Sequence, residues 1–182
     1  MLLYLLYVIG ALIALLLLYA ALRPAQRSIS RSLIIAARPE TLFPYINNGK
    51  KSFEWMPWKD SDPGVTMQYS GPAEGVGASS AWVSSGKMGI GNAVIVASVL
   101  NKSVQTQLTY TKPVAMSQLA EISLEPVTSG TKVTWSVNCH NGFFFRLIGL
   151  FVNFDKLVGG EFEKGLRKLK SLTENPNERG LR

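Results

Sequence analysis

Cysteine and histidine are almost absent from this chain of 182 residues, which contains one of each, Cys139 and His140. A single cysteine excludes an intrachain disulfide, so cysteine use does not indicate whether the protein works in an oxidising or a reducing compartment. One cysteine and one histidine are too few for a zinc site built from clusters of these residues, so we expect no metal. A hydrolase with a histidine base would have to use His140 alone.

Complete glycine-rich nucleotide motifs are also lacking. The pairs Gly75/Gly77 and Gly89/Gly91 each lack a third glycine and lie between predicted strands, whereas a dinucleotide fingerprint opens a helix. We interpret them as turn glycines and expect no cofactor. The chain has a net charge of +7, but it has no strand that interleaves basic and aromatic residues, so we expect no nucleic acid partner.

Charge is missing from residues 2–22, and the first basic residue is Arg23. A span of about 20 apolar residues crosses a bilayer core of roughly 30 Å, so residues 1–22 are predicted to be a transmembrane anchor. A cleaved signal peptide is the alternative. It is disfavoured because no basic residue precedes the run, the run exceeds about 15 residues, and no clear small-x-small cleavage site follows.

The residues around the predicted anchor bear on its orientation and pairing. Arg23, Arg27 and Arg31 follow it directly, and the positive-inside tendency places the globular part in the cytoplasm, although the opposite side stays open. Gly10 and Ala14 form a small-x-x-x-small pair that could seat a second copy of the helix. We therefore expect a single-pass membrane protein, with homodimerisation through α-helix pairing as a further hypothesis.

The rest of the chain has the length of one domain with its own core, predicted over residues 23–174, with a polar tail over 175–182. A strand over 28–37 precedes a short helix that opens at Pro39, and a second short helical piece covers 50–58. Six strand-sized runs then follow, separated by turns too short for crossover helices, so the sheet is predicted to be antiparallel. These runs cover residues 65–70, 76–84, 92–100, 103–112, 117–125 and 131–139.

Apolar residues recur at helical spacing from about residue 143 to 173. This period predicts one long amphipathic helix with a wide apolar stripe. A helix of that length could lie across the whole concave face of a twisted sheet. The predicted fold class is therefore α+β, with a seven-stranded antiparallel sheet, two short helices after the first strand, and a long C-terminal helix.

Several segments, together with this order of elements, resemble the helix-grip fold of the SRPBCC (START and birch-pollen-allergen-like) superfamily. Residues 37–43 (ARPETLF) resemble its A-x-P-E-x-V-F entry to the first helix. Residues 54–58 (EWMPW) are similar to the E-W-S-P-W segment of its bacterial polyketide cyclase/dehydrase-like branch. Segments 69–78, 130–135 and 149–166 also look like this branch, in which a single N-terminal membrane helix is familiar.

The resemblance implies a cavity between the sheet and the long helix that holds an apolar molecule. Our first hypothesis is a membrane-anchored binding protein for a hydrophobic or lipid-like small molecule. The second is a cyclase- or dehydratase-type enzyme with Tyr110 or Asp155 as acid or base, and the third is a non-catalytic interaction module for another membrane protein. The residues expected to line the cavity are Leu108, Tyr110, Ile122, Trp135, Leu150, Phe154 and Val158.

Overall fold

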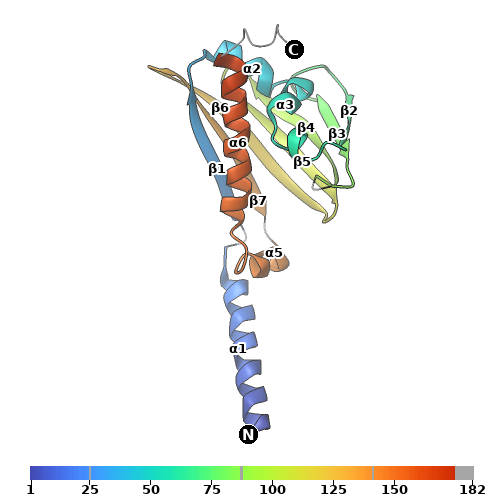
Figure 1. The fold of residues 1–182 in the computed structure, drawn as a ribbon, viewed down its shortest axis with the longest axis vertical. Helices are drawn as coiled ribbons and strands as arrows, with labels where there is room; N and C mark the ends of the chain where they lie inside the picture. The colour runs from blue at the N-terminus through green and yellow to red at the C-terminus, as the bar shows by residue number, and fades with distance from the viewer. Residues whose placement is uncertain (25, 87, 141, 175–182) are drawn as a thin grey trace.

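The computed structural model describes residues 1–24, 26–86, 88–140 and 142–174. The polar tail predicted for residues 175–182 lies outside these ranges. A long N-terminal helix projects from one end of a domain in which helices cover one face of a sheet (Figure 1). The elements follow in the order α1 (Leu2–Leu22), β1 (Gln26–Ile35), α2 (Pro39–Ile46), α3 (Gly49–Trp55), α4 (Trp58–Ser61), β2 (Thr66–Ser70), β3 (Ser79–Val83), β4 (Ile90–Val99), β5 (Ser103–Lys112), β6 (Met116–Val127), β7 (Gly130–His140), α5 (Phe143–Ile148) and α6 (Phe154–Glu174).

The sheet has seven strands in the order β1-β7-β6-β5-β4-β3-β2, and every neighbouring pair is antiparallel. Strands β2 to β7 form a meander of hairpins, and β1 closes the sheet against β7. The predicted α+β helix-grip fold is therefore confirmed. Short turns between strands leave no room for crossovers, which is why the sequence predicted this pairing.

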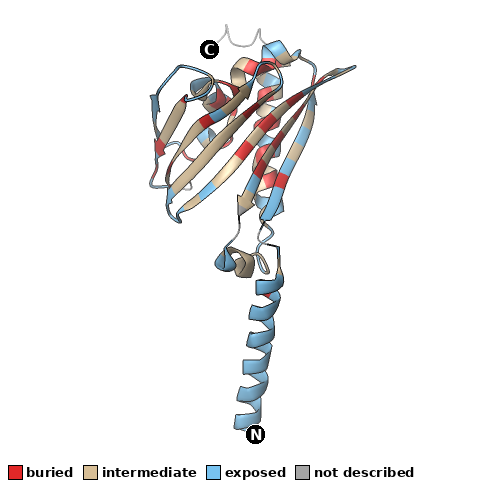
Figure 2. Ribbon diagram, turned by 180° about the vertical axis from the view of Figure 1, so that it is seen from behind, coloured by how far each residue is buried: buried red, intermediate tan, exposed pale blue. Residues whose placement is uncertain are grey.

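The two faces of the sheet differ in polarity because side chains alternate along each strand. On β7, Val133, Trp135 and Val137 are buried, whereas Thr134 and Ser136 between them are half-buried on the other face. Figure 2, which views the molecule from behind, shows this alternation across several strands. The inner face, under the helices, therefore carries the core, and the outer face is largely polar.

The predicted single helix over residues 143–173 is wrong, because the structure has two helices, α5 and α6, with residues 149–153 between them. Gly149 ends α5, where its N–H donates to the carbonyl of Phe145. The Asn153 side chain then accepts a hydrogen bond from the N–H of Lys156 at 3.0 Å, which is N-cap chemistry for α6. Apolar residues keep a helical period through the break, so periodicity alone cannot reveal it.

The short helices also differ from the prediction of two after the first strand, since the structure has three, α2, α3 and α4. Pro57 separates α3 from α4, and the residue before it, Met56, is extended as the proline ring requires. Helix α6 packs mainly against β1 and has smaller contacts with β7, α2 and α3. It therefore covers one side of the sheet rather than its whole width.

Candidate functional site

The trough between the inner face of the sheet and α6 has two different halves along the strands. In the half distal from α1, Trp135 of β7 stacks on Phe162 of α6 with ring centroids 4.1 Å apart and an interplanar angle of 12°. Trp55 and Trp58 meet the Trp135 ring edge-on at 5.2 and 5.8 Å. These four aromatic rings pack together from the middle of the strands, and the fully buried Val133 and Leu169 continue the core away from α1, so the distal half is a solid core.

Local structure holds these rings in place. The Trp55 indole N–H and the Ser52 hydroxyl both donate to the Tyr45 carbonyl at 2.9 Å, which ties α3 to α2. On α6, a Cβ atom at Gly165 would lie 2.9 Å from the Trp135 ring. A glycine is therefore needed there for α6 to approach the sheet this closely.

The half proximal to α1 is more open. Strand register places Arg27, Cys139, Gln118, Leu108 and Ala93 in one row across β1, β7, β6, β5 and β4, and this row begins close to the end of α1. Arg27 is exposed and the other four are half-buried. By contrast, the row that contains Trp135 lies four residues further along β1 and is largely buried. The inner face thus becomes more accessible toward α1.

The residues predicted to line a cavity divide between these halves. Trp135 and Ile122 are buried in the distal core, whereas Leu108, Phe154 and Val158 are half-buried and pack against that core from the proximal side. Leu150 is also half-buried, but it lies between α5 and α6 rather than on α6. Trp135 and Phe154 belong to the same inner-face cluster.

Sequence reasoning missed Ala93 and Gln118, which the register places beside Leu108. Both are small or polar residues in loosely alternating strands, so no local signal separated them from outer-face positions. Only the pairing of β4, β5 and β6 reveals their common face. They add a small side chain and an amide to the surface beside Leu108.

Tyr110 lies at the proximal end of the inner face, on β5. Its ring meets Trp82 edge-on, with centroids 5.4 Å apart. Burial raises the pKa of the Tyr110 phenol above its ordinary value, and the neighbouring Cys139 adds to the shift. The phenol is therefore neutral near pH 7, where it can donate a hydrogen bond but is a poor general base.

Asp155, the other candidate acid or base, is engaged in an ion pair at the sheet edge. Its carboxylate accepts hydrogen bonds from the Arg31 guanidinium at 2.8 and 3.1 Å. Hydrogen bonding to Arg31 lowers the pKa of Asp155. Arg31 is on β1, whereas Tyr110 is on β5, three strands away and six residues along from the position in register with Arg31. The structure therefore does not bring the two candidates together.

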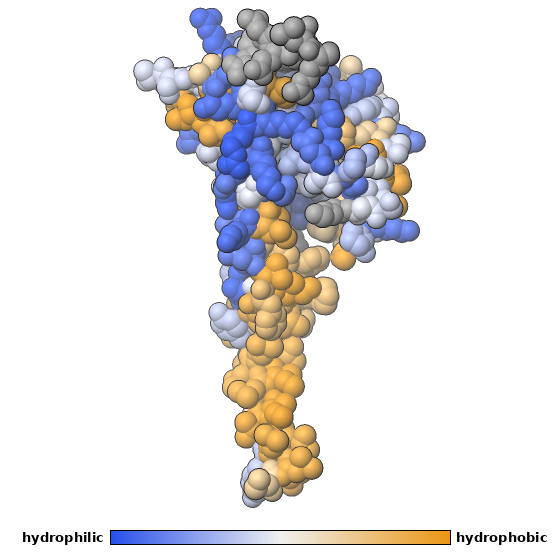
Figure 3. Space-filling view, viewed as in Figure 1, coloured by the Kyte–Doolittle hydropathy of each residue, from blue (hydrophilic) through white to orange (hydrophobic). Residues whose placement is uncertain are grey.

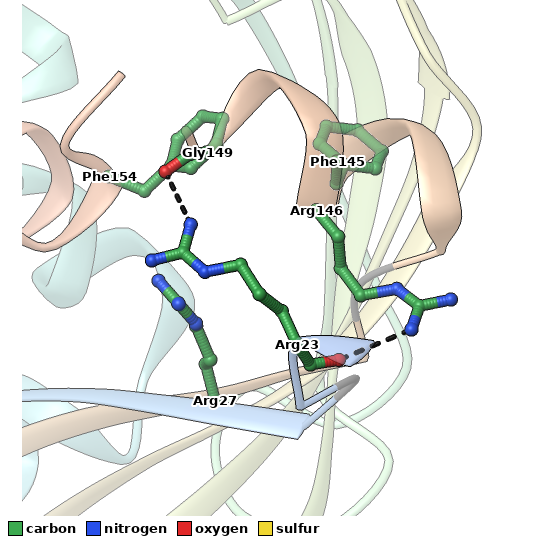
Figure 4. A pocket seen from close by; sticks show the side chains of 6 residues that line it. All are labelled: Arg23, Arg27, Phe145, Arg146, Gly149 and Phe154. Carbon is green, nitrogen blue, oxygen red and sulfur yellow. Dashed lines mark hydrogen bonds between the residues drawn. The ribbon is translucent and has the colours of Figure 1, made fainter. Parts of the chain in front are cut away.

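A small hollow of about 10 Å³ lies beside the junction of α1 and the domain. The Arg23 guanidinium donates to the Gly149 carbonyl at 2.8 Å, and the Arg146 guanidinium donates to the carbonyls of Ala21 at 2.7 Å and Arg23 at 3.2 Å. Figure 4 shows these side chains around the hollow. Its lining consists of Arg23, Arg27, Phe145, Arg146, Gly149 and Phe154.

A larger groove of about 260 Å³ is open to solvent between α4 and α6. Its lysines are already paired, Lys168 with Asp60 and Lys164 with Glu161, both at 2.7 Å. This charged surface does not suit an apolar ligand. Within the part of the chain that the structure describes, no group of three or more histidine, cysteine, aspartate or glutamate residues could hold a metal ion.

Solved structures share this fold. A protein from Chromobacterium violaceum is 13% identical, with a TM-score of 0.58 over 84% of this chain and 99% of its own. The di-domain ARO/CYC protein StfQ from the steffimycin biosynthetic pathway is 10% identical, with a TM-score of 0.59 over 84% of this chain and 52% of its own. Ara h 8.0201 is 13% identical, with a TM-score of 0.53 over 80% of this chain and 99% of its own.

Sequence comparison gives the family. No curated protein matches the chain significantly. The family described as "Polyketide cyclase / dehydrase and lipid transport" matches residues 26–174, from the first residue of β1 to the last residue of α6. The match covers most of the chain and the whole of the helix-grip domain. The chain therefore belongs to the polyketide cyclase/dehydrase and lipid transport family.

Proposed function

We propose that this protein is a membrane-anchored binding protein for a hydrophobic or lipid-like small molecule, held in the proximal half of the trough. The observation that carries the proposal is the half-buried inner-face row of Ala93, Leu108, Gln118 and Cys139, which lies next to α1. The rings around Trp135 close the far end. A ligand would enter from the end that faces the anchor.

The composition of the proximal half suits such a ligand. Leu108, Phe154 and Val158 supply apolar surface, and the neutral phenol of Tyr110 and the amide of Gln118 supply hydrogen bonds. Binding sites for small apolar molecules combine a mainly apolar lining with a few polar groups that orient the ligand. The family description, which includes lipid transport, agrees with this chemistry.

The proposal includes retention of α1 in the membrane. This helix has 21 residues, is long and apolar enough to span a bilayer, and exposes large apolar side chains along its length. Contacts at its C-terminal end support retention over cleavage, because Ala20 is fully buried and the Ala21 carbonyl accepts a hydrogen bond from Arg146. A signal peptide removed after export would not need such contacts with the folded domain. Tethering raises the effective concentration of a ligand that partitions into lipid.

Filling the trough tests the proposal. Ala93 faces inward beside Leu108, whereas Val94 faces outward on the same strand. The probe is cis-parinaric acid, excited by energy transfer from the tryptophans of the full chain in nanodiscs. We expect Ala93→Phe to weaken its binding about tenfold, in keeping with a loss of roughly 1.4 kcal/mol. Val94→Phe is the matched control and should bind like the unaltered chain.

An equal affinity of the two variants for the probe would contradict ligand binding in the trough. A second candidate, a non-catalytic interaction module for another membrane protein, then becomes the better explanation. The rings around Trp135 already occupy one part of the trough, and a proximal half that binds no ligand would leave only the outer surfaces for contact. If Ala93→Phe reduces binding of the probe and Val94→Phe does not, the result favours the first proposal.

A further inference from the structure

A cluster of apolar side chains stands exposed at the end of the domain nearest α1. Phe144 is 62% exposed and Phe151 is 76% exposed, and Phe143 and Val152 are exposed as well. They belong to α5 and the connection to α6, which we call the interfacial segment (residues 143–152). In the space-filling view the hydrophobic surface runs from α1 onto the adjoining end of the domain (Figure 3). Exposed aromatic rings gathered in this way mark a contact surface.

The position of the interfacial segment is set by its bonds to the end of α1. Helix α5 contacts α1, and Arg146 of α5 donates hydrogen bonds to the carbonyls of Ala21 and Arg23. The 21 residues of α1 are about 31 Å long, which matches a hydrocarbon core of roughly 30 Å. If α1 spans the bilayer, its C-terminal end lies at the boundary between acyl chains and headgroups, and so does α5.

Three arginines gather beside the interfacial segment, and the nearest carboxylate along the chain, Asp155, is paired with Arg31. Arg23, Arg27 and Arg146 line one hollow, and no carboxylate of the described ranges pairs with any of them. The Arg146 Nε atom is buried and has no hydrogen-bond partner among the described residues. Guanidinium groups bind phosphate oxygens in bidentate geometry, so this cluster is suited to phosphate groups at headgroup depth.

We propose that the interfacial segment is a second membrane contact, which lies flat at the bilayer surface beside α1. Phe143, Phe144 and Phe151 enter the boundary between headgroups and acyl chains, and the arginine cluster binds the phosphates of anionic phospholipids. This contact holds the open, proximal end of the trough against the lipid. The proposal rests on the proposed function only in requiring that α1 spans the membrane.

Depth-dependent fluorescence quenching tests the apolar contact. The full chain with Cys139→Ser carries one new cysteine, Phe144→Cys or Phe151→Cys, which bears an environment-sensitive dye. It is reconstituted at one copy per nanodisc in phosphatidylcholine and phosphatidylglycerol, with a spin label high on the acyl chain. Leu12→Cys in α1 is the positive control. Leu100→Cys, an exposed apolar position in the β4–β5 turn, is the matched negative control.

We expect lipid quenching at residues 144 and 151 to exceed that at residue 100 at least about twofold, as for side chains buried at the interface. Quenching at residues 144 and 151 no stronger than at residue 100, with strong quenching at residue 12, would overturn this inference and leave the anchor intact. Absence of quenching at residue 12 as well would overturn the anchor proposal itself. A single copy without other proteins excludes shielding by a second copy or a protein partner.

The arginine cluster is tested by native mass spectrometry of phosphatidylglycerol retained on the full chain. The side chain of Arg27 forms no hydrogen bond with the described residues, so Arg27→Gln leaves the α1–α5 bonds in place. We expect it to lower phosphatidylglycerol affinity about fivefold, the effect of one cation at an anionic surface. Arg38→Gln, at the start of α2, is the control and should change nothing. Equal retention by the two variants, or equal displacement of the lipid by inorganic phosphate, would contradict a lipid phosphate site.

Discussion

The guanidinium group of Arg31 lies against Gly159, in the space that a Cβ atom on residue 159 would occupy. From that position Arg31 donates to Asp155 at 2.8 Å and to Glu163 at 3.0 Å, one helical turn to either side. A single β1 side chain thus bonds to two turns of α6. This contact sets how α6 lies over β1, and so where the trough begins.

Replacement of Gly159 should therefore disturb the contact of α6 with β1. Gly159→Ala introduces a methyl group into the space of the Arg31 guanidinium, which is the end of a flexible side chain and must move aside, so we expect the variant to be less stable than its matched control by up to about 1 kcal/mol in the free energy of unfolding. Gly160→Ala is the matched control, because its Cβ meets nothing within 4 Å. The control should be neutral or stabilising by up to about 1 kcal/mol, since alanine favours helix. Thermal unfolding in detergent, followed by circular dichroism, measures both, and equal unfolding midpoints would contradict the contact.

The ion pair of Asp155 with Arg31 should make stability depend on pH in the acid range. Hydrogen bonding to Arg31 lowers the folded-state pKa of Asp155 below its ordinary value of 3.8. A lowered pKa contributes stability above the ordinary value, and that stability is lost as the pH falls through the folded-state pKa. The Asp155→Asn variant should unfold at a lower temperature than the unaltered chain near neutral pH, and the gap should close in acid. A gap that persists below the folded-state pKa would assign the effect to packing rather than charge.

The aromatic cluster should carry much of the domain's stability. Trp135 is 4% exposed, and its ring contacts those of Phe162, Trp55 and Trp58. We expect Trp135→Ala to lower the free energy of unfolding by about 3 to 5 kcal/mol, the cost of removing a large buried ring. Leu100→Ala, in an exposed turn, should stay within about 0.5 kcal/mol of the unaltered chain. A small effect at Trp135 would mean that the distal half is less tightly packed than the ring contacts indicate.

Much of the fold could be predicted because its signals are local. An uncharged run ahead of Arg23 marks α1, alternation around Trp135 marks β7, and Pro39 marks the start of α2. Short turns leave antiparallel pairing as the simplest arrangement of the strands. The break between α5 and α6 was missed because apolar residues continue at helical spacing on both sides of Gly149 and Asn153.

The candidate site was predicted less well, since Leu108 and Trp135 both read from the sequence as inward-facing and apolar. Leu108 and Trp135 differ in which side chains from other elements cover them. Phe162, Trp55 and Trp58 cover Trp135, while Leu108 has half-buried neighbours, Ala93 and Gln118, beside it. Such differences depend on residues far apart in the chain, which no local period records.

The sequence by itself determined that an apolar helix leads into one antiparallel domain of this family, because periodicity, turn residues and the lack of charge act over a few neighbouring positions. Only the tertiary structure decided which half of the trough is solid, and that α5 and its arginines gather beside α1. Those outcomes follow from strand register and helix packing, which join residues more than a hundred positions apart, such as Arg146 and Ala21.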